Sequence, residues 1–206
     1  MADDISEDGK ISEGTISRPL YRIVEGSSPA LEFECPPNCE ITAAKGAFLA
    51  KAPAIAVSGS AQGDNFDCYV NNSDETEILY LSPSSAGSLI AFDMGLHKKG
   101  LIVSAASLFA TTQDVELEVL LDLSLDGLSD AYRLYQVQGA GLVIGFMGGD
   151  LFPLSLADED CLQVDASALA AMETSISFEL EQLSNGQYVA SLTGPGRVWL
   201  QSMAVQ

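Results

Sequence analysis

Hydrophobic and polar residues alternate along several stretches of the chain. In the clearest stretch, mostly acidic residues separate the apolar residues Val115, Leu117, Val119, Leu121, Leu123 and Leu125. Because successive side chains of a β-strand point to opposite faces, this spacing predicts a strand with one buried and one solvated face. Residues 31–35 and 176–181 show the same alternation. The pattern predicts an all-β fold with little helix.

Three segments of the chain align with one another without gaps. They read ITAAKGAFLAKAPAIAV from Ile41, LIVSAASLFATTQDVEL from Leu101 and LQVDASALAAMETSISF from Leu162. Apolar residues occupy the same columns in all three, so we expect a β-sandwich or β-helix-like domain of three degenerate repeats that share one core. The expected repeats lie near 30–95, 96–156 and 157–206. The alanine-rich stretch 166–172 has helix propensity, but its place in the third segment favours a strand or a turn.

A glycine recurs in a second piece of each repeat, just before an apolar run, at Gly87, Gly141 and Gly196. Glycine adopts backbone conformations that other residues avoid, so we expect an arch through a glycine turn in each repeat. Trp199, the only tryptophan, lies between Val198 and Leu200 in the last of these runs. We expect it in the core or at an interface.

Residues 1–17 are rich in acidic residues, glycine and serine and almost free of large apolar residues. Such a composition predicts a disordered acidic tail, which leaves 18–206 as a single all-β domain. The start of the chain lacks the apolar region of a secretory signal, and its acidic residues argue against a mitochondrial leader, so a cytoplasmic location is expected. The longest uncharged stretch, 134–149, contains glutamines and glycines and is too short for a membrane-spanning helix. No transmembrane segment is expected.

The chain carries 9 Lys and Arg against 29 Asp and Glu, a formal net charge of −20. This charge repels phosphate backbones and anionic lipid headgroups, and the basic residues Lys45, Lys51, Arg133 and Arg197 are scattered. Nucleic acid is therefore not an expected partner. An equally weighted interpretation of the charge is adaptation to an acidic or salty host cytoplasm, which would say nothing about function.

His97 is the only histidine, and it lies in the polar sequence LHKKG between the first and second repeats. A catalytic triad would need this one residue, and no G-x-S-x-G nucleophile motif accompanies it. We interpret His97 as a solvated turn residue. No catalytic residue is assigned, and the protein is not expected to be an enzyme.

Cys35 and Cys39, in CPPNC, have a spacing that could place two thiolates on one zinc ion, with Cys68 or Cys161 as further ligands. A second close Cys or His pair is missing, so the favoured interpretation is a Pro-Pro turn flanked by packed, reduced thiols. The acidic clusters 158–160 and 64–67 lack the ligand spacing of a calcium loop and are interpreted as solvated charge. No metal ion or cofactor is expected.

The segments GAFLAKAP, GAGLVIGFMGGDLFPLSL and LTGPGRVWLQS are similar to those of a bacterial and mitochondrial family, the one named after altered inheritance of mitochondria protein twenty-four. The resemblance covers about Leu20 to Met203. It implies a fold like that of the tryptophan RNA-binding attenuator protein, a TRAP-like fold of β-sandwich repeats. These motifs are glycine and apolar patterns, which bear on fold more than on activity.

Three hypotheses for the function follow. The leading one is a non-enzymatic interaction or scaffold protein, a homo-oligomer that presents a rigid β-surface to an unknown protein partner or to an assembly near a membrane. The alternative is a small-molecule or lipid-binding module that uses an apolar cleft between repeats. The third, an enzyme, would need a constellation of groups around His97 or a cysteine.

Overall fold

The structure, a computed structural model, describes residues 18–26, 28–60, 65–123 and 133–204. The predicted tail 1–17 and Leu125 lie outside the described residues. The described residues form strands β1 to β19 and two short 3-10 turns, so the prediction of an all-β fold with little helix is confirmed. All strand pairs are antiparallel.

The strands form four sheets, named A to D here. Sheet A has the order β1 (Leu20–Val24), β2 (Ala30–Cys35), β7 (Glu77–Leu81), β4 (Phe48–Lys51). Sheet B has the order β5 (Ile55–Gly59), β6 (Phe66–Asn71), β3 (Glu40–Ala44), β10 (Leu108–Thr112), β13 (Leu142–Gly148), β8 (Gly87–Asp93). Sheet C has the order β11 (Val115–Asp122), β12 (Arg133–Gly139), β9 (Leu101–Ser104), β16 (Leu169–Glu173), β19 (Gly196–Gln201), β14 (Leu151–Leu156). Sheet D has the order β15 (Cys161–Asp165), β18 (Tyr188–Thr193), β17 (Ser177–Gln182).

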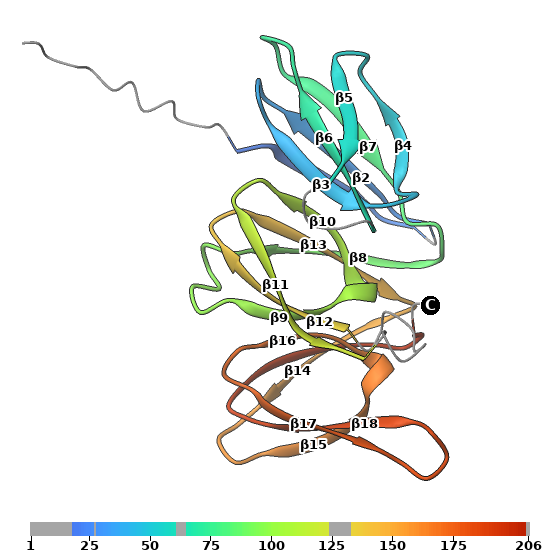
Figure 1. Ribbon diagram of the computed structural model, residues 1–206, viewed down its shortest axis with the longest axis vertical. Coiled ribbons are helices and arrows are strands. Elements are labelled where there is room, and N and C mark those ends of the chain that lie inside the picture. The colour runs from blue at the N-terminus through green and yellow to red at the C-terminus, as the bar shows by residue number, and fades with distance from the viewer. Residues whose placement is uncertain (1–17, 27, 61–64, 124–132, 205–206) are drawn as a thin grey trace, which may run out of the picture.

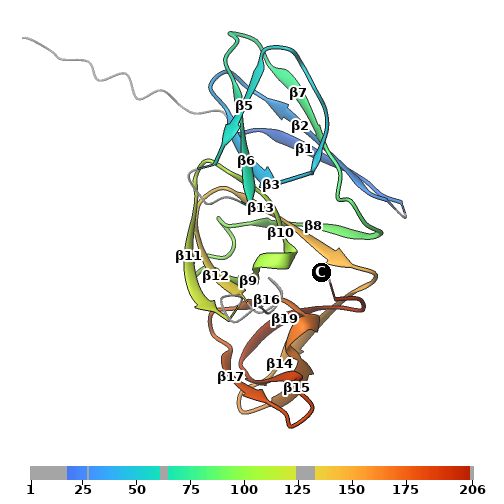
Figure 2. The same cartoon turned by 45° about the vertical axis from the view of Figure 1, so that its right-hand side comes forward.

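The same strand pairings recur in three consecutive sets, β2–β7, β8–β13 and β14–β19. In the first set β2 and β4 pair with β7, while β3 and β5 pair with β6. The second and third sets repeat these four pairings. Consecutive sets are joined by the pairs β3–β10 and β9–β16, so sheets B and C each combine strands from two sets. Figures 1 and 2 show the sets stacked along the long axis, from blue at the top to red at the bottom.

Strand pairing corrects the predicted role of Gly87. This residue begins β8, which pairs with β13 as β2 pairs with β7. Gly141 instead lies just before β13 and Gly196 begins β19, and these strands pair with β10 and β16. The expectation that all three glycines share one position is therefore wrong for Gly87. A glycine before an apolar run can precede a strand of the β8 type or one of the β13 type. Only the strand pairing distinguishes the two types.

The described core is divided among three clusters of buried residues, one between each pair of successive sheets. Leu31 and Phe33 of sheet A meet Ile41 of sheet B in the first core, and Leu101 and Trp199 lie in the second. The third core lies between sheets C and D. The prediction of one shared core is wrong, because each inner sheet buries both of its faces.

The alternation in β11 holds only over its first half. Val115 is buried and Glu116 and Glu118 are exposed, but the register shifts between Val119 and Leu121. Such a bulge places one extra residue in a strand and turns the following side chains. Val119, the last residue before the shift, is 55% exposed, although the alternation predicted it to be buried.

The alanine-rich stretch behaves as its place in the repeat predicted. Residues Ala166–Ala168 form one 3-10 turn, η4, and β16 follows directly. The Asp165 carboxylate accepts hydrogen bonds from the backbone N–H and the hydroxyl of Ser167, which stabilises the turn. The corresponding turn of the second set is η1 (Ala105–Ser107).

Candidate ligand-binding cleft

A cleft of about 560 Å³ lies between the first and second sets. Its walls are the β3–β4 turn (44–47), the β7–β8 connection (83–86) and the two alanines of η1, with Met203 near the mouth. Four buried aromatic side chains also line it, from Phe66, Phe109, Tyr135 and Phe146. Ligand sites in proteins have this size and this mainly apolar lining.

Local backbone structure explains why the cleft is open. Gly46, at φ +82°, allows the tight β3–β4 turn, in which the Ala47 N–H bonds to the Ala44 carbonyl over 3.1 Å. Ala105 and Ala106 of η1 also line the cleft, and their short side chains fill little of its space. The C-terminal segment is held at the rim because the Met203 N–H bonds to the Gly148 carbonyl over 3.1 Å.

The polar groups of the cleft are few. Among the described residues that line it, Lys45 is the only charged one, and its side chain is exposed at the rim. Asn65, Ser84 and Ser85 provide the other polar side chains nearby. No carboxylate, thiol or imidazole is among these described lining residues.

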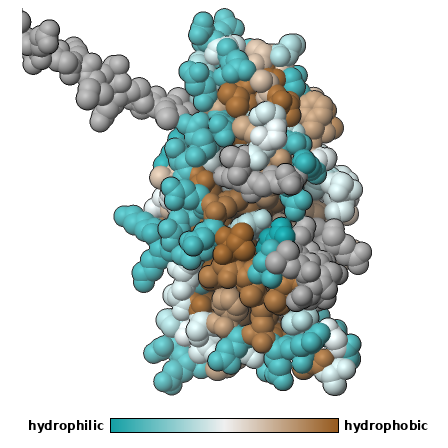
Figure 3. Space-filling view, in the orientation of Figure 1, coloured by the Kyte–Doolittle hydropathy of each residue, from teal (hydrophilic) through white to brown (hydrophobic). Residues whose placement is uncertain are grey.

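Hydrophobic residues also lie on the outside of the molecule. Figure 3 shows them gathered in the middle of the face drawn there. Large apolar side chains are exposed on several strands, including Phe48 and Leu49 of β4, Leu120 of β11 and Phe152 of β14. Apolar patches of this kind are common at interaction surfaces.

His97 differs from its predicted environment. It lies in the turn between β8 and β9, but its side chain is mostly buried rather than solvated. Its ring contacts the rings of Phe92 and Trp199 edge-on, with centroids 6.0 and 6.1 Å away. Its Nδ1 lies 4.0 Å from a Glu173 carboxylate oxygen, which also accepts a 3.0 Å hydrogen bond from Arg197. The fold brings Trp199 and Glu173 to His97 from strands far along the chain.

This environment makes stability depend on pH. Burial and the nearby Arg197 guanidinium lower the pKa of His97 below its usual 6.5, although Glu173 and Asp93 partly oppose them. When the pH falls, the unfolded chain therefore binds a proton that the folded chain resists, and the folded state loses stability. We expect the free energy of unfolding to decrease more steeply in wild type than in His97→Gln between about pH 7.5 and 5.5.

Urea unfolding of both proteins across that range would measure the difference. The variant serves as the control for the many carboxylates, which titrate in both proteins. Parallel curves for the two proteins would contradict the prediction.

Cys35, Cys39 and Cys68 are buried, free thiols, as the sequence predicted. A hydrogen bond with Cys39 and burial together raise the pKa of Cys35, and burial raises that of Cys68 to about 11. Cys161 differs, because it is exposed on β15. Among the residues that the structure describes, no three His, Cys, Asp or Glu side chains are placed to hold a metal ion.

The turn that contains Cys35 and Cys39 depends on Asn71, a residue that belongs to none of the motifs visible in the sequence. Its buried amide donates to the carbonyls of Cys35, Pro36 and Glu75 over 2.8–3.2 Å. Its oxygen accepts hydrogen bonds from the backbone N–H and the hydroxyl of Ser73. A single asparagine thus closes two turns, a role that has no recognisable sequence signal.

The remaining charged candidates are separate from one another. Asp158–Asp160 form an exposed turn in which Asp160 accepts the Ala157 N–H over 2.8 Å, and Asp64 lies outside the described residues. Arg133 pairs with Asp122 and Arg197 with Glu173, whereas the Lys51 ammonium donates to the Ile55 carbonyl. Within the described ranges, no helix has the length and apolarity needed to cross a membrane.

Comparison with known proteins identifies the fold and the family. Over 91% of this chain and 94% of that one, the structure is similar to the crystal structure of protein SPYM3_0169 from Streptococcus pyogenes, with a TM-score of 0.78. The two sequences are 14% identical, so this likeness concerns the fold alone. No curated protein matches the sequence. The family model described as mitochondrial biogenesis AIM24 matches residues 21–203, and the chain therefore belongs to the AIM24 family.

Proposed function

We propose that the protein is a non-enzymatic binding protein that holds a long, mainly apolar molecule with an anionic end in its cleft. The observation that carries this proposal is the 560 Å³ cleft lined by four buried aromatic rings, with a single lysine at its rim. An apolar chain gains free energy by leaving water, and the Lys45 ammonium attracts a carboxylate. The molecular class that fits is a long-chain fatty acid.

Substitutions in the cleft should weaken binding of cis-parinaric acid, a fluorescent long-chain carboxylate. In Ala86→Phe, the new ring would occupy the cleft, and the dissociation constant should rise about tenfold or more. Lys45→Gln removes the cation at the rim and should raise the dissociation constant about threefold, as expected for an exposed ion pair. Fluorescence titration measures both effects.

Two matched controls make the same replacements away from the cleft. Ala56→Phe lies on the exposed face of β5, and Lys99→Gln lies in the turn before β9. Neither should change the dissociation constant. Equal affinity in all four variants, or no binding by wild type, would refute the proposed site.

A second candidate function is an oligomeric interaction protein, the leading hypothesis from the sequence. The exposed apolar residues on β4 and β14 favour it, because Phe48, Leu49 and Phe152 are half exposed or more. Burying such side chains against another chain is favourable. Mass measured by light scattering over a range of protein concentrations tests this candidate, and a monomer at every concentration would exclude a homo-oligomer.

A further inference from the structure

The two ends of the stack present complementary strand edges. Inside the molecule, β10 pairs with β3 of the preceding set, and β16 pairs with β9. In the first set β4 takes the place of β10, but among the described strands it pairs with β7 alone. In the third set β15 takes the place of β3, and its one partner among the described strands is β18. Unpaired strand edges are templates for pairing with another chain.

The β4 edge has the same local structure as the edges that are paired. The strands β4, β10 and β16 each show a register shift against their neighbour, across Leu49, Phe109 and Ala170 respectively. The residue after each shift lies opposite Tyr80, Ile144 or Trp199. A bulge repeated at one position establishes which residues correspond.

These corresponding residues are buried between sets but exposed at the end of the stack. Phe109 and Ile144 of the second set are buried in the first core, and Ala170 and Trp199 of the third set are buried in the second core. Leu49 and Tyr80 are instead 56% and 36% exposed. Among the described residues, no side chain covers Leu49 and Tyr80 in the way that the first and second cores cover their counterparts, so the outer face of the first set is an open version of a contact that the molecule makes twice.

At the other end of the stack, the third core lacks described residues from a following set. The described residues of the third core come from the second and third sets, so nothing occupies the place that a following set fills in the other two cores. Leu162 is only partly buried, whereas its counterparts Ile41 and Leu101 are completely buried. Phe178 and Leu180 are partly buried as well. An apolar surface from outside could complete this core.

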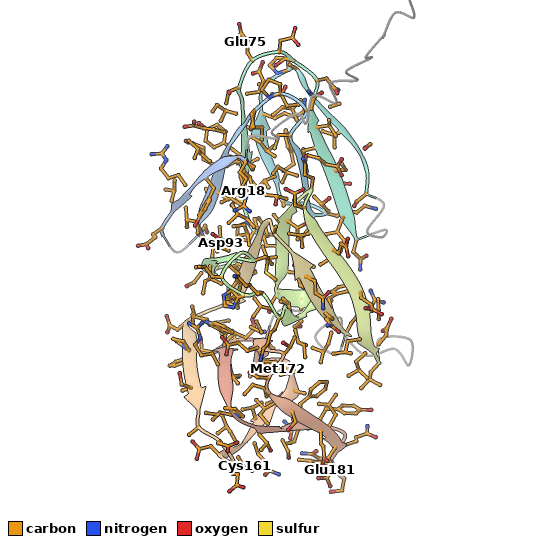
Figure 4. All side chains as sticks on the ribbon, turned by 90° about the vertical axis from the view of Figure 1, so that its left-hand side faces the viewer. Arg18, Glu75, Asp93, Cys161, Met172 and Glu181 are labelled. Carbon is orange, nitrogen blue, oxygen red and sulfur yellow. The ribbon has the colours of Figure 1, made fainter. Side chains whose placement is uncertain are left out.

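The two edges cannot pair within one chain. Figure 1 shows β4 in the uppermost set and β15 at the bottom of the stack. In Figure 4, Cys161 of β15 and Glu181 of β17 lie at the end of the molecule opposite Glu75. A second copy supplies the complementary edge.

We propose that β15 of one copy pairs antiparallel with β4 of a second copy and thereby joins sheet D to sheet A. This inference rests on the second candidate function, assembly, and names its surface. The internal pairs Ala110–Ala43 and Ala171–Val103 set the register, which places Ala50 opposite Val164 and Lys51 opposite Gln163. Leu49 and Tyr80 then cover the third core of the neighbouring copy. The contact is head-to-tail, so it closes into a ring or continues as a chain of copies.

Charge affects this contact in two ways. The register places Lys51 diagonally opposite Asp165, which favours pairing. The ion pair between Arg22 and Glu32, 2.7 Å long, lies on the same face as Tyr80 and is already satisfied when it is covered. The net charge of −20 repels a second copy, so assembly should strengthen as salt rises from about 0.05 to 0.5 M.

Light scattering on wild type, Leu49→Asp and Leu96→Asp tests the surface. Leu49→Asp would bury a carboxylate in the contact, so the dissociation constant of assembly should rise at least tenfold. Leu96→Asp is the matched control, because Leu96 is 82% exposed in the turn before β9 and lies at neither edge. Wild type and the control should show the same mass above that of a monomer.

Cross-linking tests the register. In a Cys161→Ser background, a Lys51→Cys chain mixed with a Gln163→Cys chain should give a disulfide-linked dimer when the thiol oxidant diamide is added. A mixture of Lys99→Cys and Gln163→Cys chains should not. If wild type forms an oligomer that Leu49→Asp leaves intact and no cross-link appears, the surface is wrong although assembly stands. If wild type is a monomer at every salt concentration, both the proposed surface and the assembly itself are wrong.

Discussion

Replacing Trp199 by alanine is expected to lower the free energy of unfolding by about 3–5 kcal/mol, as for other large aromatic residues removed from a core. The indole is buried in the second core, although β19 belongs to the third set. It contacts the Phe92 ring edge-on at 5.0 Å, and the Arg197 guanidinium lies 5.5 Å from its centre. Its removal would leave a cavity between two sets and also expose His97.

Chemical denaturation followed by far-UV circular dichroism would measure this change in the free energy of unfolding. The signal reports on the backbone, so it remains usable when the tryptophan is removed. Phe152→Ala is the matched control, because Phe152 lies on the neighbouring strand β14, opposite Leu200, and is 50% exposed. Removing the Phe152 side chain should lower the free energy of unfolding by less than about 1 kcal/mol. Similar losses for the two variants would show that Trp199 does not hold the second and third sets together.

Gly139→Ala is expected to destabilise the protein by about 3 kcal/mol, through a backbone conformation and a steric contact together. Gly139 ends β12 at φ +121°, where residues with a side chain are strained. A Cβ atom there would also overlap the Asp114 carbonyl oxygen and approach the Val115 Cα to 3.2 Å. Both neighbours are backbone atoms, which cannot rotate away.

Gly186→Ala separates the two causes. Gly186 also has a positive φ, +86°, but nothing lies within 4 Å of an added Cβ. It should show the conformational cost alone, about 1–2 kcal/mol. Thermal unfolding of both variants would measure the difference, and an equal loss would mean that the β10–β11 turn beside Gly139 moves away without cost.

The candidate site was only partly visible in the sequence. The hypothesis of an apolar cleft between repeats did not name its residues, because they come from the β3–β4 turn, the β7–β8 connection and η1, far apart in the chain. Alanine and serine in these segments have no pattern that separates a cleft wall from an ordinary loop. In the sequence Lys45 is only one of several scattered cations, since its position at the rim depends on how two sets pack.

By itself, the sequence determined the local structure of this protein. Period-two alternation specified strands such as β2 and the first half of β11, because each residue of a strand faces the side opposite its neighbours. The aligned columns anticipated that residues such as Ile41 and Leu101 would be buried, and the low count of histidines limited the available chemistry.

Tertiary structure alone decided which strands join. The difference between Gly87 and Gly141, the division into three cores and the burial of His97 beside Trp199 all depend on pairing between residues distant in sequence. The same holds for the edges of β4 and β15 that no other described strand pairs with, whose sequences resemble those of their paired counterparts. A strand pattern specifies which face is apolar, but it does not encode the neighbour along its edge, because backbone hydrogen bonds are the same for every residue except proline.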